Sequence, residues 1–213
     1  METLREFYKI GNGPSSSHTM GPERAASLFK KRVEKKYGEN LRYKAELYGS
    51  LAATGKGHLT DYIIKETLQN AEKDNIEVKF MPEIVPEFHT NGVRFFVYKN
   101  EDKNFENPME QALFFSVGGG SILVYKLNNY EVNLNFENPS IVVVHTDYPG
   151  VIAKVTDELY KYGVNICDFH LSRKSKGGEA LMTIGMDSMP DRKIEEDISA
   201  IDYVSAVNIL DRL

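Results

Sequence analysis

The first part of the chain carries two kinds of apolar spacing, one typical of helices and one typical of strands. Residues 22–37 place an apolar side chain at every fourth position from Ala25, with a proline at the start and Gly38 directly after, which predicts a helix. Residues 41–47 alternate apolar and charged side chains, which predicts a half-buried strand. A second helical pattern follows over residues 59–74.

Further strands are expected at 93–98 and on either side of the glycine run SVGGGS at 116–121. The dipeptide Asn91–Gly92 predicts a turn. The first part of the chain therefore mixes helices and strands, as in an α/β domain.

The pattern changes at NFENPS, residues 135–140, and from there strands and helices follow the order βαββαβ, the ferredoxin-like plan. The expected elements are strand 141–146, helix 149–162, strand 164–173, strand 179–186, helix 190–200 and strand 203–210. The sequence thus predicts an α+β protein with two domains, 1–137 and 138–213.

Composition and charge narrow the class of protein. The chain has 213 residues, 41% of them apolar and 27% charged, which is typical of a globular protein. The formal net charge of −5 gives no reason to expect a nucleic-acid partner. No run of about 18 apolar residues is present, and the N-terminus lacks the basic start and apolar core of a secretory signal. We therefore expect a cytoplasmic protein with no membrane partner.

The start of the second domain resembles the ACT domain family over residues 147–166, DYPGVIAKVTDELYKYGVNI. Pro149 favours the start of a helix, Gly150 allows close approach of a small ligand, and the free amides of a helix N-terminus suit a carboxylate. The resemblance implies self-association and an amino-acid effector held between paired copies. The matching positions are Asp147, Gly150, Val151, Asn165 and Ile166. The alternative is a domain that dimerises and binds no ligand.

A loop rich in hydroxyl groups precedes the first predicted helix, in the segment GPSSSHTMGPERAA at residues 13–26. Hydroxyl side chains flank His18, the residue type whose pKa lies nearest neutrality. Read alone, the segment favours a turn that caps the helix. The nucleophile motif GxSxG is absent, so a serine hydrolase has little support.

A second polar loop, GSLAATGKGH at residues 49–58, ends in Lys56, a glycine and His58. The spacing of its glycines differs from that of a phosphate-binding loop, which argues against nucleotide binding. For His58 the alternative is a helix N-terminal residue that contacts only the backbone.

Together the two loops resemble the paired motifs of the iron–sulfur-dependent L-serine dehydratases. The glycine run SVGGGS and the terminal ACT-like segment fit the beta chain of the two-chain form, so the resemblance covers essentially the whole sequence. It implies that the first domain is similar to the allosteric substrate-binding domain of some phosphoglycerate dehydrogenases. It also implies conversion of L-serine to pyruvate and ammonia by β-elimination of water.

The resemblance implies a 4Fe-4S cluster as the cofactor, which needs about three thiolates and one open position. This chain has one cysteine, Cys167, so it cannot hold the cluster alone. The cluster is therefore expected on a separate alpha chain, with no metal ligand on this one. A pyridoxal phosphate enzyme is disfavoured, because no large cofactor domain is indicated.

His18 and His58 match the active-site histidines of the family, one as general base toward the Cα proton and the other as an orienting or proton-shuttling group. The sequence leaves open which does which. The expected substrate contacts are Ser15, Ser16, Ser17 and Thr19 to the carboxylate or ammonium of L-serine, and Lys56 to the carboxylate. The competing hypothesis is a catalytically inert regulatory subunit that senses amino acids with both domains.

Overall fold

The computed structural model describes residues 15–70, 75–86 and 88–212. The remaining residues are 1–14, 71–74, 87 and 213. Three parts of the sequence therefore lie outside the described residues. They are the N-terminus, which was expected to carry no secretory signal, the first two residues of the serine-rich segment and the end of the second predicted helix.

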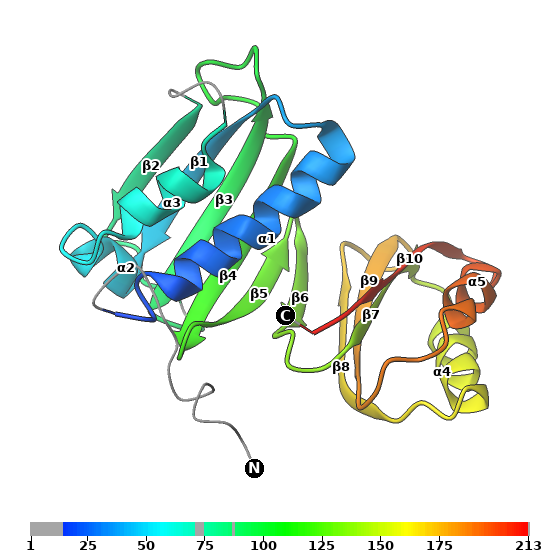
Figure 1. The fold of residues 1–213 in the computed structure, drawn as a ribbon. Helices are drawn as coiled ribbons and strands as arrows, with labels where there is room; N and C mark the ends of the chain where they lie inside the picture. Colours follow the sequence, from blue (N-terminus) through cyan, green and yellow to red (C-terminus); the bar gives the residue numbers. More distant parts are fainter. Residues whose placement is uncertain (1–14, 71–74, 87, 213) are drawn as a thin grey trace. The chain divides into compact units, whose positions relative to one another are not determined.

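Helices and strands alternate along the first part of the described chain, and strands dominate its middle (Figure 1). The helices are α1 (Met20–Tyr37), α2 (Gly49–Thr54), α3 (Thr60–Leu68), α4 (Val151–Lys161) and α5 (Lys193–Ser199). The strands are β1 (Leu41–Tyr48), β2 (Ile76–Met81), β3 (Asn91–Lys99), β4 (Glu110–Gly118), β5 (Ser121–Leu127), β6 (Tyr130–Leu134), β7 (Ser140–Thr146), β8 (Ile166–Arg173), β9 (Glu179–Met186) and β10 (Val204–Leu210).

These strands form two sheets, which confirms the α+β class. The first has the order β2-β1-β3-β4-β5-β6, with β1 and β2 parallel and β1–β3, β3–β4 and β5–β6 antiparallel. The second has the order β10-β7-β9-β8 with every pair antiparallel. Its elements run β7, α4, β8, β9, α5, β10, so the predicted βαββαβ order is confirmed.

The chain divides into two compact units, residues 1–122 and 123–213, and the division falls inside β5. The sequence change at 135–140 instead marks the loop that leads into the second sheet. The domain boundary between residues 137 and 138 stays a prediction.

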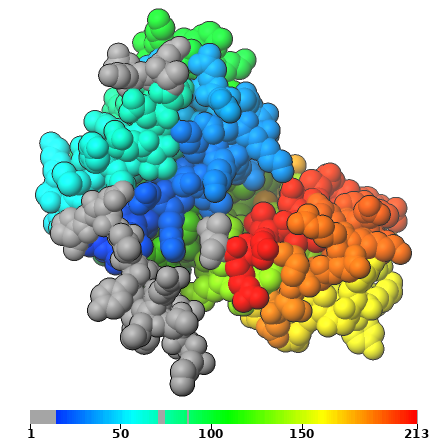
Figure 2. All heavy atoms as spheres, viewed as in Figure 1, coloured from blue at the N-terminus to red at the C-terminus, as the bar shows by residue number. Residues whose placement is uncertain are grey.

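In the first unit, α1 and α3 lie across one face of the sheet (Figure 1). Phe29 of α1 stacks on Phe95 of β3 at 5.6 Å between ring centroids, and Phe114 of β4 meets Phe95 edge-on at 5.7 Å. All three side chains are at most 2% exposed, so burial of aromatic surface holds α1 to the sheet. Blue α1 atoms adjoin cyan atoms of the 49–68 segment on the visible face of Figure 2.

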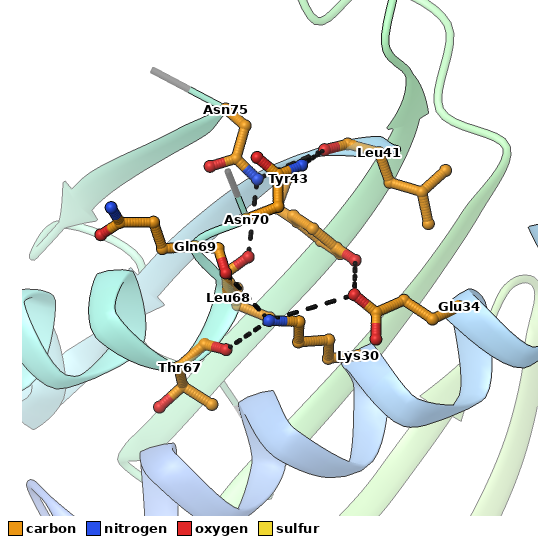
Figure 3. A network of polar contacts seen from close by, with 9 residues as sticks. All are labelled: Lys30, Glu34, Leu41, Tyr43, Thr67, Leu68, Gln69, Asn70 and Asn75. Atoms are coloured by element: carbon orange, nitrogen blue, oxygen red, sulfur yellow. Dashed lines mark hydrogen bonds and ion pairs between the residues drawn. The ribbon is translucent and has the colours of Figure 1, made fainter. Parts of the chain in front are cut away.

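A polar network fixes the far end of α3 against α1 (Figure 3). Lys30 donates from Nζ to the carbonyl oxygens of Thr67 and Gln69 at 3.1 and 2.9 Å, which satisfies carbonyls at the end of the helix. Glu34 accepts a hydrogen bond from Tyr43 of β1 at 3.5 Å. Burial, reinforced by Glu34, raises the pKa of Tyr43, which therefore stays protonated. With its end fixed, α3 holds the loop before it in place.

The second unit packs α4 and α5 on one face of its sheet. The core cluster includes Ile141, Met182 and Ile184 from the strands with Val155 and Ile198 from the helices, all at 0% exposure. Apolar side chains of the helices and of the strands therefore share one core.

Several elements differ from the expectation. Asn91 and Gly92 begin β3 instead of forming a turn, because Asn91 also forms a bridge with Gly49 that prolongs the pairing. Helix α1 begins two residues early, at Met20, and α3 ends at Leu68. No pattern in the sequence predicted α2, β2 or β6.

No helix in the described part of the chain is long and apolar enough to cross a membrane.

Candidate functional site

The serine-rich loop folds into a tight turn that leads into α1. The carbonyl oxygen of Ser15 accepts hydrogen bonds from the amides of His18 and Thr19 at 3.1 and 2.9 Å, and from the Thr19 hydroxyl at 2.7 Å. A hydroxyl of Thr60, at the start of α3, donates to the carbonyl of His18 at 2.7 Å. The turn leads into α1 as expected, but the N-cap residue Thr19 makes no side-chain capping bond to the helix. The bonds of the turn instead hold His18 in one orientation.

Four hydroxyl groups surround the ring of His18. Nδ1 lies 3.0 Å from Oγ of Ser17 and 3.3 Å from Oγ of Ser15. Nε2 lies 3.2 Å from Oγ of Ser50 and 3.0 Å from Oγ1 of Thr54. Since a hydroxyl both donates and accepts, these contacts fix the plane of the imidazole ring.

Ser50 and Thr54 reach His18 because α2 begins with a backbone shape that only glycine adopts readily. Gly49 has φ +53°, and a Cβ there would lie 2.3 Å from the carbonyl oxygen of Thr90. The amide of Ser50 donates to that same carbonyl at 2.9 Å. The loop before β3 therefore fixes the first turn of α2 beside His18.

His58 follows α2 in a turn closed by the amides of His58 and Thr60, which both donate to the carbonyl of Gly55. Its ring lies 4.6 Å from that of His18 between centroids, tilted by 36°. The next residue, Leu59, has a left-handed backbone at φ +61°, a strained conformation of the kind found at functional sites. The structure thus brings together the two predicted active-site histidines.

The protonation of the two imidazoles follows from their surroundings. His18 is 9% exposed, and burial together with the nearby His58 lowers its pKa, while a hydrogen bond with the backbone of Ser50 opposes the change. His18 is therefore neutral at pH 7. Nδ1 of His58 lies 2.9 Å from the carbonyl oxygen of Thr54, which only accepts, so Nδ1 carries the hydrogen. A neutral His58 then presents a lone pair at Nε2 and can accept a proton.

The other predicted substrate contacts occupy different positions. Ser15 and Ser17 are half-buried against His18, whereas Ser16 is exposed. Thr19 is 1% exposed, and its hydroxyl donates within the loop. Lys56 is exposed beside His58 in the chain, with Nζ 5.4 Å from the centre of the Phe80 ring.

No group of three or more histidine, cysteine or acidic residues among those described is placed to hold a metal ion. Cys167, on β8, is a free and exposed thiol. The described residues of this chain therefore do not fit a 4Fe-4S cluster, which needs about three thiolates.

In the second unit, the loop between β7 and α4 is fixed by its own polar groups. Oδ2 of Asp147 accepts hydrogen bonds from Nη1 of Arg173 at 2.7 Å and from the amide of Gly177 at 3.0 Å. These bonds lower the pKa of Asp147, the amide first and Arg173 second. Gly150 has φ +92° at the N-terminus of α4, and Val151 is buried. The carboxylate of Asp147 therefore fixes the turn between β8 and β9.

The five predicted effector residues fall at opposite ends of the second sheet. Asp147 follows β7 beside the start of β9 at Glu179, whereas Ile166 pairs with Met186 at the end of β9. Asn165 precedes Ile166, and its side-chain amide donates to Asp187 at 2.6 Å. A strand rises about 3.3 Å per residue, so the two groups lie roughly 20 Å apart. One copy of the chain does not bring all five together.

Ser50, Thr54 and Thr60, which contact His18 or His58, were not predicted from the sequence. One signal was available: Thr54 lies four residues before His58, so a short helix followed by a turn places the two near each other. The contacts of Ser50 and Thr60 with His18 span 32 and 42 residues, and no local pattern indicates them.

The first unit therefore holds two neighbouring imidazoles among hydroxyl groups, in a protein of two α+β units. Comparison with known proteins agrees with the resemblance. The family model "Serine dehydratase beta chain" matches residues 3–88. The "Probable L-serine dehydratase, beta chain" of Bacillus subtilis is 34% identical over 213 residues, covering 92% of this chain and 91% of that one.

The "L-serine dehydratase, beta chain" of Peptoniphilus asaccharolyticus is 24% identical over 206 residues, covering 89% of each chain. The chain belongs to the family of L-serine dehydratase beta chains. A solved ACT domain from GTP pyrophosphokinase of Chlorobium tepidum is similar at 18% sequence identity, with a TM-score of 0.28. The match covers 34% of this chain and 95% of the ACT domain chain. That likeness is too low to carry an inference about ligands.

Proposed function

We propose that this chain is the beta subunit of an L-serine dehydratase, which converts L-serine to pyruvate and ammonia together with a separate alpha chain. Family membership supports the reaction, because the relatives are L-serine dehydratase beta chains. The observation that carries the proposal is the pair of imidazoles, 4.6 Å apart and held by loops at both ends of the chain segment 15–60.

His58 is the general base of the proposed reaction. Its Nε2 lone pair takes the Cα proton of L-serine while the β-hydroxyl leaves as hydroxide, which forms the Cα–Cβ double bond of an enamine. The enamine becomes an imine, and addition of water to the imine releases ammonia and leaves pyruvate. His58 is half-buried, so its ring is accessible to a substrate.

His18 orients the site and stays neutral beside the cation that forms on His58. Its lowered pKa keeps a second positive charge away from the protonated base. The hydroxyls of Ser15, Ser16 and Ser17 are the proposed partners of the substrate carboxylate or ammonium. Lys56 balances the carboxylate charge, and Thr19, buried and bonded to the carbonyl of Ser15, acts by holding the loop that carries these hydroxyls.

The proposed alpha chain holds the 4Fe-4S cluster, since the described residues of this chain provide no ligand set for one. When bound in the proposed alpha chain, such a cluster would supply Lewis-acid chemistry toward the leaving hydroxyl. This chain contributes the proton acceptor, His58, and the serine hydroxyls that contact the substrate.

The second unit is proposed to associate with a second copy and to bind an amino-acid effector there. The separation of Asp147, Gly150 and Val151 from Asn165 and Ile166 along β9 supports this arrangement. If two copies pair, the first group of one copy and the second group of the other can line one site.

Reconstitution tests the proposal. This chain is co-expressed with its cysteine-containing partner, the complex is prepared anaerobically, and pyruvate formation from L-serine is measured. We expect turnover by the complex and none by this chain alone. Turnover by this chain alone at the rate of the complex overturns the division of labour. A complex in which His18→Ala and His58→Ala keep full turnover and lose only serine sensitivity supports a regulatory subunit instead.

A further inference from the structure

Thr54 is the one residue whose polar atoms contact both imidazoles in the described part of the site. Its Oγ1 lies 3.0 Å from Nε2 of His18, and its carbonyl oxygen lies 2.9 Å from Nδ1 of His58. It is the last residue of α2, where backbone carbonyls have no partner inside the helix. The carbonyl that His58 uses is therefore one that the helix leaves available.

The hydroxyl of Thr54 has one hydrogen, and the structure indicates where it points. Oγ1 lies 3.0 Å from the carbonyl oxygen of Ser50, four residues earlier in α2, and that oxygen only accepts. Because the hydroxyl hydrogen of Thr54 points to the carbonyl oxygen of Ser50, Oγ1 can only accept at its contact with His18. Nε2 of His18 must then be the donor, so His18 carries its hydrogen on Nε2.

The contacts of Nδ1, on the opposite side of the His18 ring, agree with a hydrogen on Nε2. A neutral imidazole with hydrogen on Nε2 has a lone pair on Nδ1. Nδ1 faces the hydroxyls of Ser17 and Ser15, at 3.0 and 3.3 Å, and each can donate. The lone pair of His18 is thus enclosed by hydroxyl donors, whereas the lone pair of His58 is on Nε2.

We propose that Thr54 is a positioning residue that sets the tautomers of both histidines, its hydroxyl oxygen accepting from Nε2 of His18 and its carbonyl oxygen accepting from Nδ1 of His58. The catalytic consequence of this arrangement rests on the proposed function. When His58 accepts a proton on Nε2, its Nδ1 hydrogen already points to the carbonyl oxygen of Thr54, so the ring keeps its orientation. Thr54 thereby prepares one imidazole to accept a proton and the other to remain in place.

The tautomers can be measured on the full-length chain alone. The chain has five histidines, so selective ¹⁵N labelling of histidine gives few signals, and the shifts of Nδ1 and Nε2 report which nitrogen carries hydrogen. We expect hydrogen on Nε2 of His18 and on Nδ1 of His58. Hydrogen on Nδ1 of His18, or on Nε2 of His58, overturns the proposal without any variant.

Variants then test the hydroxyl. Thr54→Val keeps the shape of the side chain and removes the acceptor, so His18 is expected to become a mixture of tautomers while His58 is unchanged. Thr54→Ser is expected to keep the wild-type signals. Thr156→Val is the matched control, because Thr156 makes the same bond to the carbonyl four residues before it, in α4. An unchanged His18 signal in folded Thr54→Val contradicts the assignment.

In the reconstituted complex, Thr54→Val is expected to lower kcat about fivefold, the effect of one hydrogen bond, with KM changed by less than about twofold. Thr54→Ser restores kcat, and Thr156→Val leaves it unchanged. An equal loss in Thr54→Ser shows a packing role and overturns the proposal. A wild-type complex with no turnover counts against the proposed function alone, because the tautomers are measured without substrate.

Discussion

The two units hold their polar groups in different ways. In the first, hydroxyls enclose the His18 ring, which is 9% exposed, and a short helix and a turn bring His58 beside it. In the second, Asp147 and Asn165 bond to exposed neighbours at opposite ends of a sheet. The first arrangement brings its two predicted histidines together within one chain, whereas the second leaves its predicted effector residues at opposite ends of β9.

The same contrast appears in their ion pairs. Glu110 of β4 has a side chain that is 0% exposed and lies 2.5 Å from Nε of Arg32 and 2.9 Å from Nζ of Lys36. Asp147 pairs with Arg173 at 2.7 Å, and the Arg173 side chain is 53% exposed. Solvent screens the second pair far more than the first. Buried and exposed carboxylates therefore make different contributions to stability.

The largest effect is expected for His58→Gln in the reconstituted complex. Loss of the general base should lower kcat for pyruvate formation by about 10²- to 10⁴-fold, because glutamine cannot accept the Cα proton. Steady-state assays measure this, and His170→Gln in the second unit is the control. Turnover within about threefold of wild type in His58→Gln, equal to the control, contradicts the assignment of the base.

Glu110→Ala should lower the free energy of unfolding by about 2 kcal/mol, because it leaves Arg32 and Lys36 without their shared carboxylate, while their half-exposed side chains regain water. Urea denaturation of the full chain measures the change. Glu131→Ala, which removes an exposed partner of Lys126 at 3.5 Å, should have almost no effect. An equal loss of unfolding free energy in the two variants contradicts the expected difference between buried and exposed ion pairs.

The Glu110 contribution should also depend on pH. Burial opposes ionisation of Glu110, but Arg32 and Lys36 outweigh it and hold the pKa of this carboxyl below its usual value. The unfolded chain therefore takes up the proton first on acidification. The stabilisation is complete above the unfolded pKa of about 4.3 and is lost as the pH falls through the folded pKa. The difference between wild type and Glu110→Ala should shrink over that window, and a constant difference contradicts the ion-pair explanation.

A smaller effect is expected on the titration of His18. Burial and His58 both lower its pKa, so His58→Ala should move that pKa upward toward the value of a free histidine. The ¹⁵N-histidine titration of the full chain measures it, with His170→Ala as the control. No upward movement, or the same movement in both variants, shows that the two imidazoles do not interact.

The smallest effect is expected for Asp147→Ala, which should leave the melting temperature of the full chain unchanged, because its ion pair is exposed. If the two ends of the second sheet act across paired copies, Asp147→Ala and Asn165→Ala should each weaken the response of the complex to an amino-acid effector. A lowered melting temperature for Asp147→Ala with an unchanged response contradicts an effector role and limits the carboxylate to holding the turn between β8 and β9.

Local patterns predicted much of the fold. The apolar spacing of α1 and α4 and the alternation in β1 gave those elements, and the βαββαβ order followed from the second half of the chain. Strand β2 was missed because it lies parallel to β1 and is only half-buried along its length. The short helix α2 was missed because its six residues carry little periodicity.

The sequence predicted only the histidines of the candidate site, because the contacts around them join segments that are distant along the chain. His18 and His58 lie in segments of unusual composition, and resemblance to a family linked them. Their partners Ser50 and Thr60 come from contacts between distant segments, which depend on the packing of α1 and α3 on the sheet. Which imidazole presents a free lone pair depends on one carbonyl, that of Thr54, and no sequence pattern specifies its direction.

The most direct test of the central claim, that His58 supplies the proton acceptor, is chemical rescue of His58→Ala in the reconstituted complex. Because His58 is half-buried, free imidazole should be able to reach the vacated position. The account predicts that pyruvate formation returns in proportion to the concentration of unprotonated imidazole, and that His18→Ala shows no such return. Rescue of His18→Ala with none for His58→Ala would contradict it.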